Sequence, residues 1–187
     1  MPRDEEDVVR GVRLAVDVGS VRVGLATSDP DGLLATPVAT LARDVKASGR
    51  RVPADVAQIV HEVGERGAAV VYVGLPRHLS GTEGAASGAA RAYAVQLAQA
   101  VAPVRVRLVD ERMSTVSAHH ALQASGRSGR RHRQVVDQAA AVVILQYALD
   151  AERATGRRPG ERVDADSPQH DPVARGGTAG DGGTTLE

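Results

Sequence analysis

The sequence predicts an α/β protein: a single domain in which a mixed sheet of five strands is flanked by helices. Three observations lead to this class. A chain of 187 residues with 42% apolar composition suits one compact domain of roughly 150 residues with tails. Two segments rich in β-branched residues open the chain as a hairpin. Apolar runs of strand length then alternate with segments of helical periodicity.

The first half of the chain supplies three strands and a helix. Residues 12–18 and 21–27 form the hairpin around the tight turn Gly19-Ser20. Residues 33–41 are expected to form a third strand, at an edge of the sheet because Pro37 has no N–H to donate. Residues 53–66 carry apolar side chains at helical spacing, which predicts an amphipathic helix.

The second half alternates strands and helices. The run AAVVYVG at 68–74 is typical of a buried parallel strand. An Ala-rich helix and a strand that ends in Asp110-Glu111-Arg112 follow, and then a helix that Ser114 caps and a last helix with an apolar centre. The expected ranges are helix 82–101, strand 104–110, helix 114–124 and helix 133–150, with a flexible basic loop at 125–130.

The domain is expected to span residues 11–150. Residues 1–10 are acidic and are expected to be flexible. Residues 151–187 are rich in Gly, Pro, Asp, Arg and Thr without periodicity, which predicts a disordered tail.

Composition limits the chemistry. The chain has no Cys, which excludes disulfides and thiolate zinc sites and leaves carboxylates and His as metal ligands. It has no apolar signal core and no apolar run of the ~18 to 20 residues that span a bilayer. We therefore expect a cytoplasmic protein with no membrane partner.

Positive charge is concentrated in one stretch although the net charge is zero. Residues 105–133 carry seven Arg against two acids, an excess of +5, whereas both tails are acidic. Such a stretch suits a surface that binds phosphates. The candidate nucleic-acid-binding residues are Arg22, Arg77, Arg112, Arg127, Arg130 and Arg131.

Acidic residues are expected to meet at one edge of the sheet. Asp17 lies at the carboxyl end of the first strand, before Gly19, and a buried carboxylate there is costly unless it is paired or binds metal. Asp110 and Glu111 end a strand that should run beside the first one. The alternatives are that Asp17 is a turn residue and that the two later acids form an exposed strand end paired with Arg112.

Asp137 is a third candidate. On its helical face, residues 140, 141 and 144 are Ala, Ala and Ile, so its carboxylate points toward the packed side. It could instead pair with an Arg of the 127–133 segment. Three such acids would hold one or two Mg²⁺ or Mn²⁺ ions, which prefer oxygen ligands and support phosphodiester hydrolysis.

Four segments in order resemble the YqgF/RuvX family of Holliday-junction-resolvase-like nucleases, also regarded as processing nucleases of the 16S ribosomal RNA precursor. They are LAVDVGSVRVGLATSD (14–29), VGLPRHLSGTEG (73–84), DERMST (110–115) and VDQAAAVVILQ (136–146), and the match covers about residues 11–150. The resemblance implies an RNase H-like fold, a divalent metal, and Asp17, Glu111 and Asp137 as the catalytic, metal-binding set.

Several alternatives stay open at this stage. Asp110 can replace Glu111, because strand register decides which acid turns inward. Related resolvases often place a fourth acid where this chain has Ala140, which leaves the number of metals open. The loop with Arg77 and His78 suits phosphate but also suits a plain strand-to-helix connection.

The expected partners are nucleic acid, as precursor rRNA or branched DNA, and ribosomal precursor particles, with the protein a monomer or homodimer. The alternative function is a catalytically weak nucleic-acid-binding ribosome-assembly factor. Actin-like ATPases share the Asp-x-Gly-Ser start but need two lobes, and this chain has residues for one.

Overall fold

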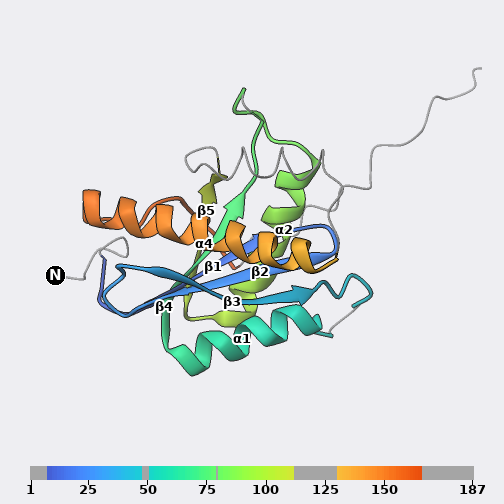
Figure 1. Ribbon diagram of the computed structural model, residues 1–187, viewed down its shortest axis with the longest axis horizontal. Helices are drawn as coiled ribbons and strands as arrows, with labels where there is room; N and C mark the ends of the chain where they lie inside the picture. The colour runs from blue at the N-terminus through green and yellow to red at the C-terminus, as the bar shows by residue number, and fades with distance from the viewer. Residues whose placement is uncertain (1–7, 48–50, 79, 112–129, 166–187) are drawn as a thin grey trace, which may run out of the picture.

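A six-stranded mixed sheet forms the centre of the molecule, with strands in the order β3-β2-β1-β4-β5-β6 (Figure 1). The computed structural model describes residues 8–47, 51–78, 80–111 and 130–165, and side chains in the last range only from 139 onward. The elements are β1 (Val12–Val18), β2 (Arg22–Ser28), β3 (Ala35–Ala42), α1 (Ala54–Arg66), β4 (Ala68–Leu75), α2 (Ala85–Val101), β5 (Arg105–Asp110), α4 (Arg130–Thr155) and β6 (Glu161–Arg162).

The sheet is mixed, with parallel strands at its centre and antiparallel strands on both sides. The first three strands form an antiparallel meander, β4 is parallel to β1, and β5 is parallel to β4. The short β6 closes the far edge antiparallel to β5. An antiparallel meander extended by two parallel crossover strands is the RNase H-like arrangement, so the predicted fold class is confirmed, with six strands instead of five.

Helices cover both faces of the sheet, and Figure 1 shows α4 crossing in front of the strands. One apolar cluster joins α1 and α2 to one face, and a second joins α4 to the other. Alternation along β1 produces this split: Leu14 and Val16 enter the first cluster, and Ala15 enters the second. The small side chains of Ala15, Ala26 and Ala141 let α4 pack closely on its face.

Most predicted elements are confirmed, with shifts of a few residues at their ends. β3 lies at the sheet edge, where Pro37 costs no inner ladder bond. The hairpin, α1, β4, α2 and β5 all occur where the pattern predicts them. The expected helix at 114–124 and most of the basic loop at 125–130 lie outside the described residues, whereas Arg130 already belongs to α4.

The predicted domain boundary at residue 150 is wrong. α4 continues to Thr155, and Glu152 is buried, where it pairs with Arg13 at 2.8 Å and accepts a hydrogen bond from the Tyr72 hydroxyl. The chain then returns to the sheet as β6, and the Val163 N–H donates to Val106 O at 3.0 Å. Composition could not predict this docking, because residues 151–165 are mostly polar and the residues that they contact are distant in sequence. Residues 166–187 lie outside the description.

Within the described residues, no helix is both long enough and apolar enough to span a bilayer.

Candidate active site

Asp17 is the second-last residue of β1, just before the turn of the hairpin. It pairs with Gly24 of β2, alternates with Val16, and so lies on the α4 face of the sheet, with 6% of its surface exposed. The hairpin turn closes directly after it, with Gly19 N–H donating to Arg22 O at 2.9 Å. A Cβ at Gly19 would lie 2.9 Å from that same oxygen, so the close turn requires glycine.

Glu111 reaches Asp17 across an intervening strand. The expectation that β5 runs beside β1 is wrong, because β4 lies between them. The carboxylate of Glu111 lies over Gly74 of β4: a Cβ built on Gly74 would be 2.5 Å from Glu111 Oε1 and 2.6 Å from Ile144 Cδ1. The missing side chain at Gly74 therefore creates the space that the Glu111 carboxylate occupies, on the strand next to β1 and Asp17.

The charge of Asp17 acts on the carboxyl of Glu111. Burial, the charge of Asp17 and the charge of Asp110 together raise the pKa of Glu111 to about 8. Glu111 is only 7% exposed, so water screens this repulsion poorly. A divalent cation bound by oxygen ligands would compensate both charges, and the donor set here fits such an ion.

Register separates the two adjacent acids. Glu111 continues the alternation of Arg107 and Val109, which face α4 and the side of the sheet that carries Asp17. Asp110 alternates with these positions, and its carboxylate lies 3.9 Å from Arg77 Nε. Glu111, rather than Asp110, is therefore the acid that shares the buried face with Asp17.

Asp137 lies in α4, but its side chain is outside the description. Its position is four residues before Ala141 and seven before Ile144, both of which are buried against the sheet. Helical periodicity puts residue 137 on this same face, toward the helix N-terminus. Among the described residues, no group of three or more His, Asp or Glu side chains forms that could hold a metal ion.

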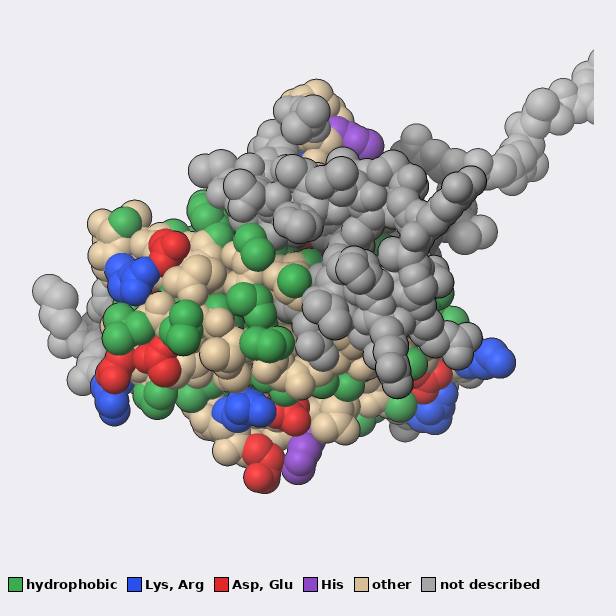
Figure 2. Space-filling model, in the orientation of Figure 1, with side chains coloured by type: hydrophobic (Ala, Val, Ile, Leu, Met, Phe, Trp, Pro, Cys, Tyr) green, Lys and Arg blue, Asp and Glu red, His purple; other side chains and the backbone are tan. Residues whose placement is uncertain are grey.

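The predicted phosphate-binding arginines are only partly described. Arg77 follows β4 and contacts Glu83 at 3.0 Å, while its buried Nε makes no hydrogen bond. Arg22 begins β2, opposite Ala42. Arg112 and Arg127 lie outside the described residues, as do the side chains of Arg130 and Arg131, so this part of the prediction stays a prediction. Figure 2 shows hydrophobic side chains over the described part of α4, with no cluster of Lys and Arg there.

A residue that the sequence analysis missed, Arg43, contacts the turn next to Asp17. Its Nη1 donates to Gly19 O at 3.2 Å. Nothing in the sequence marks this arginine among the others, because its place depends on the docking of β3 beside β2.

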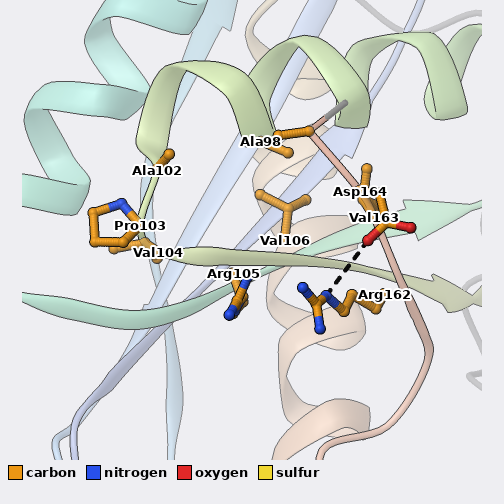
Figure 3. A pocket seen from close by; sticks show the side chains of 10 residues that line it. Ala98, Ala102, Pro103, Val104, Arg105, Val106, Arg162, Val163 and Asp164 are labelled. Carbon is orange, nitrogen blue, oxygen red and sulfur yellow. Dashed lines mark ion pairs between the residues drawn. The ribbon is translucent and has the colours of Figure 1, made fainter. Parts of the chain in front are cut away.

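A cavity in the described part of the chain lies away from the acids. A volume of about 580 Å³ opens between the end of α2 and the start of β5, and its lining includes Ala98, Arg105 and Arg162, the last paired with Asp164 (Figure 3). Glu111 follows the opposite end of β5. This cavity is therefore separate from the acid pair.

The sheet topology and the buried acids at the carboxyl ends of its strands define the class as RNase H-like nucleases. Within it, the chain belongs to the RuvX family, described as "Holliday junction resolvase", which matches residues 11–151.

Curated relatives support this assignment. A Nocardia farcinica protein named "Putative pre-16S rRNA nuclease" is 50% identical over 134 residues, which cover 72% of this chain and 74% of that protein. A Frankia casuarinae protein of the same name is 55% identical over 124 residues, covering 66% and 59% of the two chains. Among solved structures, Thermus thermophilus RuvC bound to a Holliday junction substrate aligns with a TM-score of 0.44 at 15% identity, covering 80% of this chain and 99% of that one.

Proposed function

We propose that this nuclease depends on a divalent metal and cuts phosphodiester bonds in structured nucleic acid. The observation that carries the proposal is a pair of buried carboxylates on one face of the sheet: Glu111 lies over Gly74, and the charge of Asp17 acts on it. A divalent cation would offset the repulsion between these two buried acids, and hard divalent ions prefer such oxygen ligands.

Asp17, Glu111 and Asp137 would hold one or two Mg²⁺ or Mn²⁺ ions. Such ions supply an activated water and stabilise the leaving oxygen when bound. The backbone position of Asp137, on the sheet-facing side of α4, supports its place in this set. The identity of the metal and the number of ions belong to the proposal.

Basic residues around this edge would bind the substrate backbone. Arg77 supports this role because its charge and its unbonded Nε lie beside Asp110, next to the acid pair. Arg22 begins the strand that follows the Asp17 turn. Arg112, Arg127, Arg130 and Arg131 are proposed to extend the same contact.

The names of the relatives favour processing of the 5′ end of precursor 16S rRNA, and the family description favours Holliday junctions. Action on precursor rRNA would place the protein in the cytoplasm, in contact with ribosomal precursor particles. Symmetric cutting of a junction would require a homodimer, whereas cutting of one RNA strand needs only a monomer.

The test is cleavage of a precursor 16S RNA fragment and of a four-way DNA junction with Mg²⁺ or Mn²⁺. We expect Asp17→Asn to abolish cleavage while binding persists, because the variant keeps the fold but loses a ligand charge. The matched control is Asp31→Asn, since Asp31 lies in the β2–β3 loop, is exposed and pairs with Arg10, which precedes β1. If wild type and Asp17→Asn bind equally and neither cuts, the protein is a binding factor.

A further inference from the structure

Arg43 follows β3 and contacts the turn that carries Asp17. Its backbone N–H donates to Val21 O at 3.0 Å, and its Nη1 donates to Gly19 O at 3.2 Å. Gly19 is two residues after Asp17. The guanidinium of Arg43 is therefore anchored to the turn that follows Asp17. Both the β1–β2 turn and the end of β3 lie at the right of Figure 1.

The side chain of Arg43 packs on the ring of Tyr93, which is itself hydrogen-bonded to a buried acid. Its guanidinium carbon lies 5.2 Å from the centroid of the Tyr93 ring in α2, a cation–π contact. The Tyr93 hydroxyl donates to Asp55 Oδ2 in α1 at 3.0 Å, and both residues are buried. Three elements thus fix the direction of this guanidinium before any ligand arrives.

Arg43 keeps most of its donors available. In the described part of the chain, it forms no ion pair with a carboxylate, whereas Arg51 pairs with Asp44 and Arg66 with Glu62, each at 2.8 Å. A guanidinium has five N–H donors, and one of them is bound to Gly19. Arg43 is also partly exposed. A fixed, unpaired cation with spare donors is suited to a bidentate oxyanion.

The sheet places Arg43 on the opposite face from Arg22. Arg22 pairs with Ala42, so both arginines lie at the same end of β2 and β3. Arg22 precedes Val23, which faces α1 and α2, so position 22 lies on the α4 face with Asp17. Arg43 lies on the α1 and α2 face, against Tyr93. The two arginines therefore flank the Gly19-Ser20 turn from both sides.

We propose that Arg43 binds a backbone phosphate of the nucleic-acid substrate, close to the bond that is cut. The substrate would then pass over the end of the sheet at the Gly19-Ser20 turn, from the face that carries α4 to the face that carries α1 and α2. This inference rests on the proposed function and adds a phosphate subsite to it. DNA and RNA offer the same phosphodiester group, so the shared chemistry is the ligand.

The competing explanation is structural: Arg43 would only offset the buried charge of Asp55 through Tyr93. Tyr93→Phe separates the two roles, because it keeps the aromatic ring under Arg43 and removes the hydroxyl bonded to Asp55.

The experiment measures binding of a labelled four-way DNA junction and of a labelled precursor 16S RNA fragment to the full chain at several salt concentrations. All variants carry Asp17→Asn so that the probes stay intact. We expect Arg43→Ala to lower the slope of log K against log[salt] by about 0.7 to 0.9, the loss of one phosphate contact. Arg43→Lys should restore the slope but only part of the affinity, because lysine cannot bind a phosphate in the bidentate way. Tyr93→Phe should keep the slope.

The matched control is Arg66→Ala, at the opposite end of α1, which should leave the slope unchanged. A lower melting temperature for Arg43→Ala with an unchanged slope for both probes would overturn the proposal in favour of the structural role. A reduced slope for one probe supports it and identifies the substrate. No salt-dependent binding by the Asp17→Asn parent and by wild type would overturn the proposed function as well.

Discussion

At the scale of single residues, the acid pair depends on Gly74, because only a residue without a side chain leaves space there for Glu111. The carboxylate of Glu111 and the side chain of Ile144 both occupy the space where a side chain at residue 74 would lie. Glycine is needed here for space and not for an unusual backbone, since the residue continues a regular strand. The residue between the two acids is therefore as important to the site as the acids themselves.

Gly74→Ala should weaken metal binding and lower the free energy of unfolding by about 1 to 3 kcal/mol, because overpacking forces Glu111 and Ile144 to move. Calorimetric titration with Mn²⁺ and urea unfolding measure the two effects. Gly88→Ala is the matched control: nothing lies within 4 Å of its added Cβ, and alanine is favoured inside the exposed part of α2. Equal Mn²⁺ affinity in both variants would contradict the assigned role of Gly74.

The residues of the site differ in how far sequence reveals them. Asp17 and Glu111 could be proposed from their positions at strand ends. The choice between Asp110 and Glu111 could not, because it depends on alternation within a strand whose register is set by β4. Arg43 could not be found either, since its contacts join β3, α2 and the hairpin turn.

At the scale of elements, the last turns of α4 fix the helix to the sheet. Glu152 pairs with Arg13 of β1, and both side chains are almost fully buried. Tyr72 of β4 donates to the same carboxylate. Because one end of α4 is held in this way, the other end, which carries position 137, is directed along the sheet toward the acid pair.

Glu152→Gln should destabilise the protein by about 3 to 5 kcal/mol, since it leaves the buried charge of Arg13 without a counter-charge. Urea unfolding followed by circular dichroism measures this. Asp150→Asn, two residues earlier on an exposed surface, removes a pair with Arg153 and should cost less than about 1 kcal/mol. Similar losses of unfolding free energy in the two variants would show that the buried pair of Arg13 and Glu152 does not fix α4 to the sheet.

The end of α4 and the strand β6 could not be predicted from the sequence. Periodicity located every described helix, but composition alone placed the end of the domain at 150. Residues 151–165 contain few apolar side chains, and they dock through a buried ion pair and through backbone bonds to β5. Such contacts produce no local hydrophobic pattern.

At the scale of the whole molecule, the acid pair gives the folded state a pH dependence. The pKa of Glu111 lies at about 8 in the folded protein, above its ordinary value of 4.5. Its contribution to stability is therefore fully present below pH 4.5 and is lost as the pH rises through 8. The free energy of unfolding of the metal-free protein should therefore fall as the pH rises from 4.5 through 8.

Glu111→Gln removes that dependence, because the amide stays neutral. In a chelator, the variant should exceed wild type in free energy of unfolding by an amount that grows from pH 5 to pH 9, to at most about 5 kcal/mol. Urea titrations across this range measure it, and Mg²⁺ should restore stability to wild type only. Glu65→Gln, on the exposed side of α1, is the control. Parallel pH profiles for wild type and Glu111→Gln would contradict the assignment.

The sequence by itself determined the fold class, the order of the described elements up to residue 150, and the acids available for chemistry. These properties follow from local periodicity and from residue type, which each segment carries on its own. Only the tertiary structure decided that β4 separates β1 from β5, that Gly74 leaves space for Glu111 above it, and that Arg43 contacts the turn after Asp17. These relations depend on strand order and register, which arise when segments distant in the chain pack against one another.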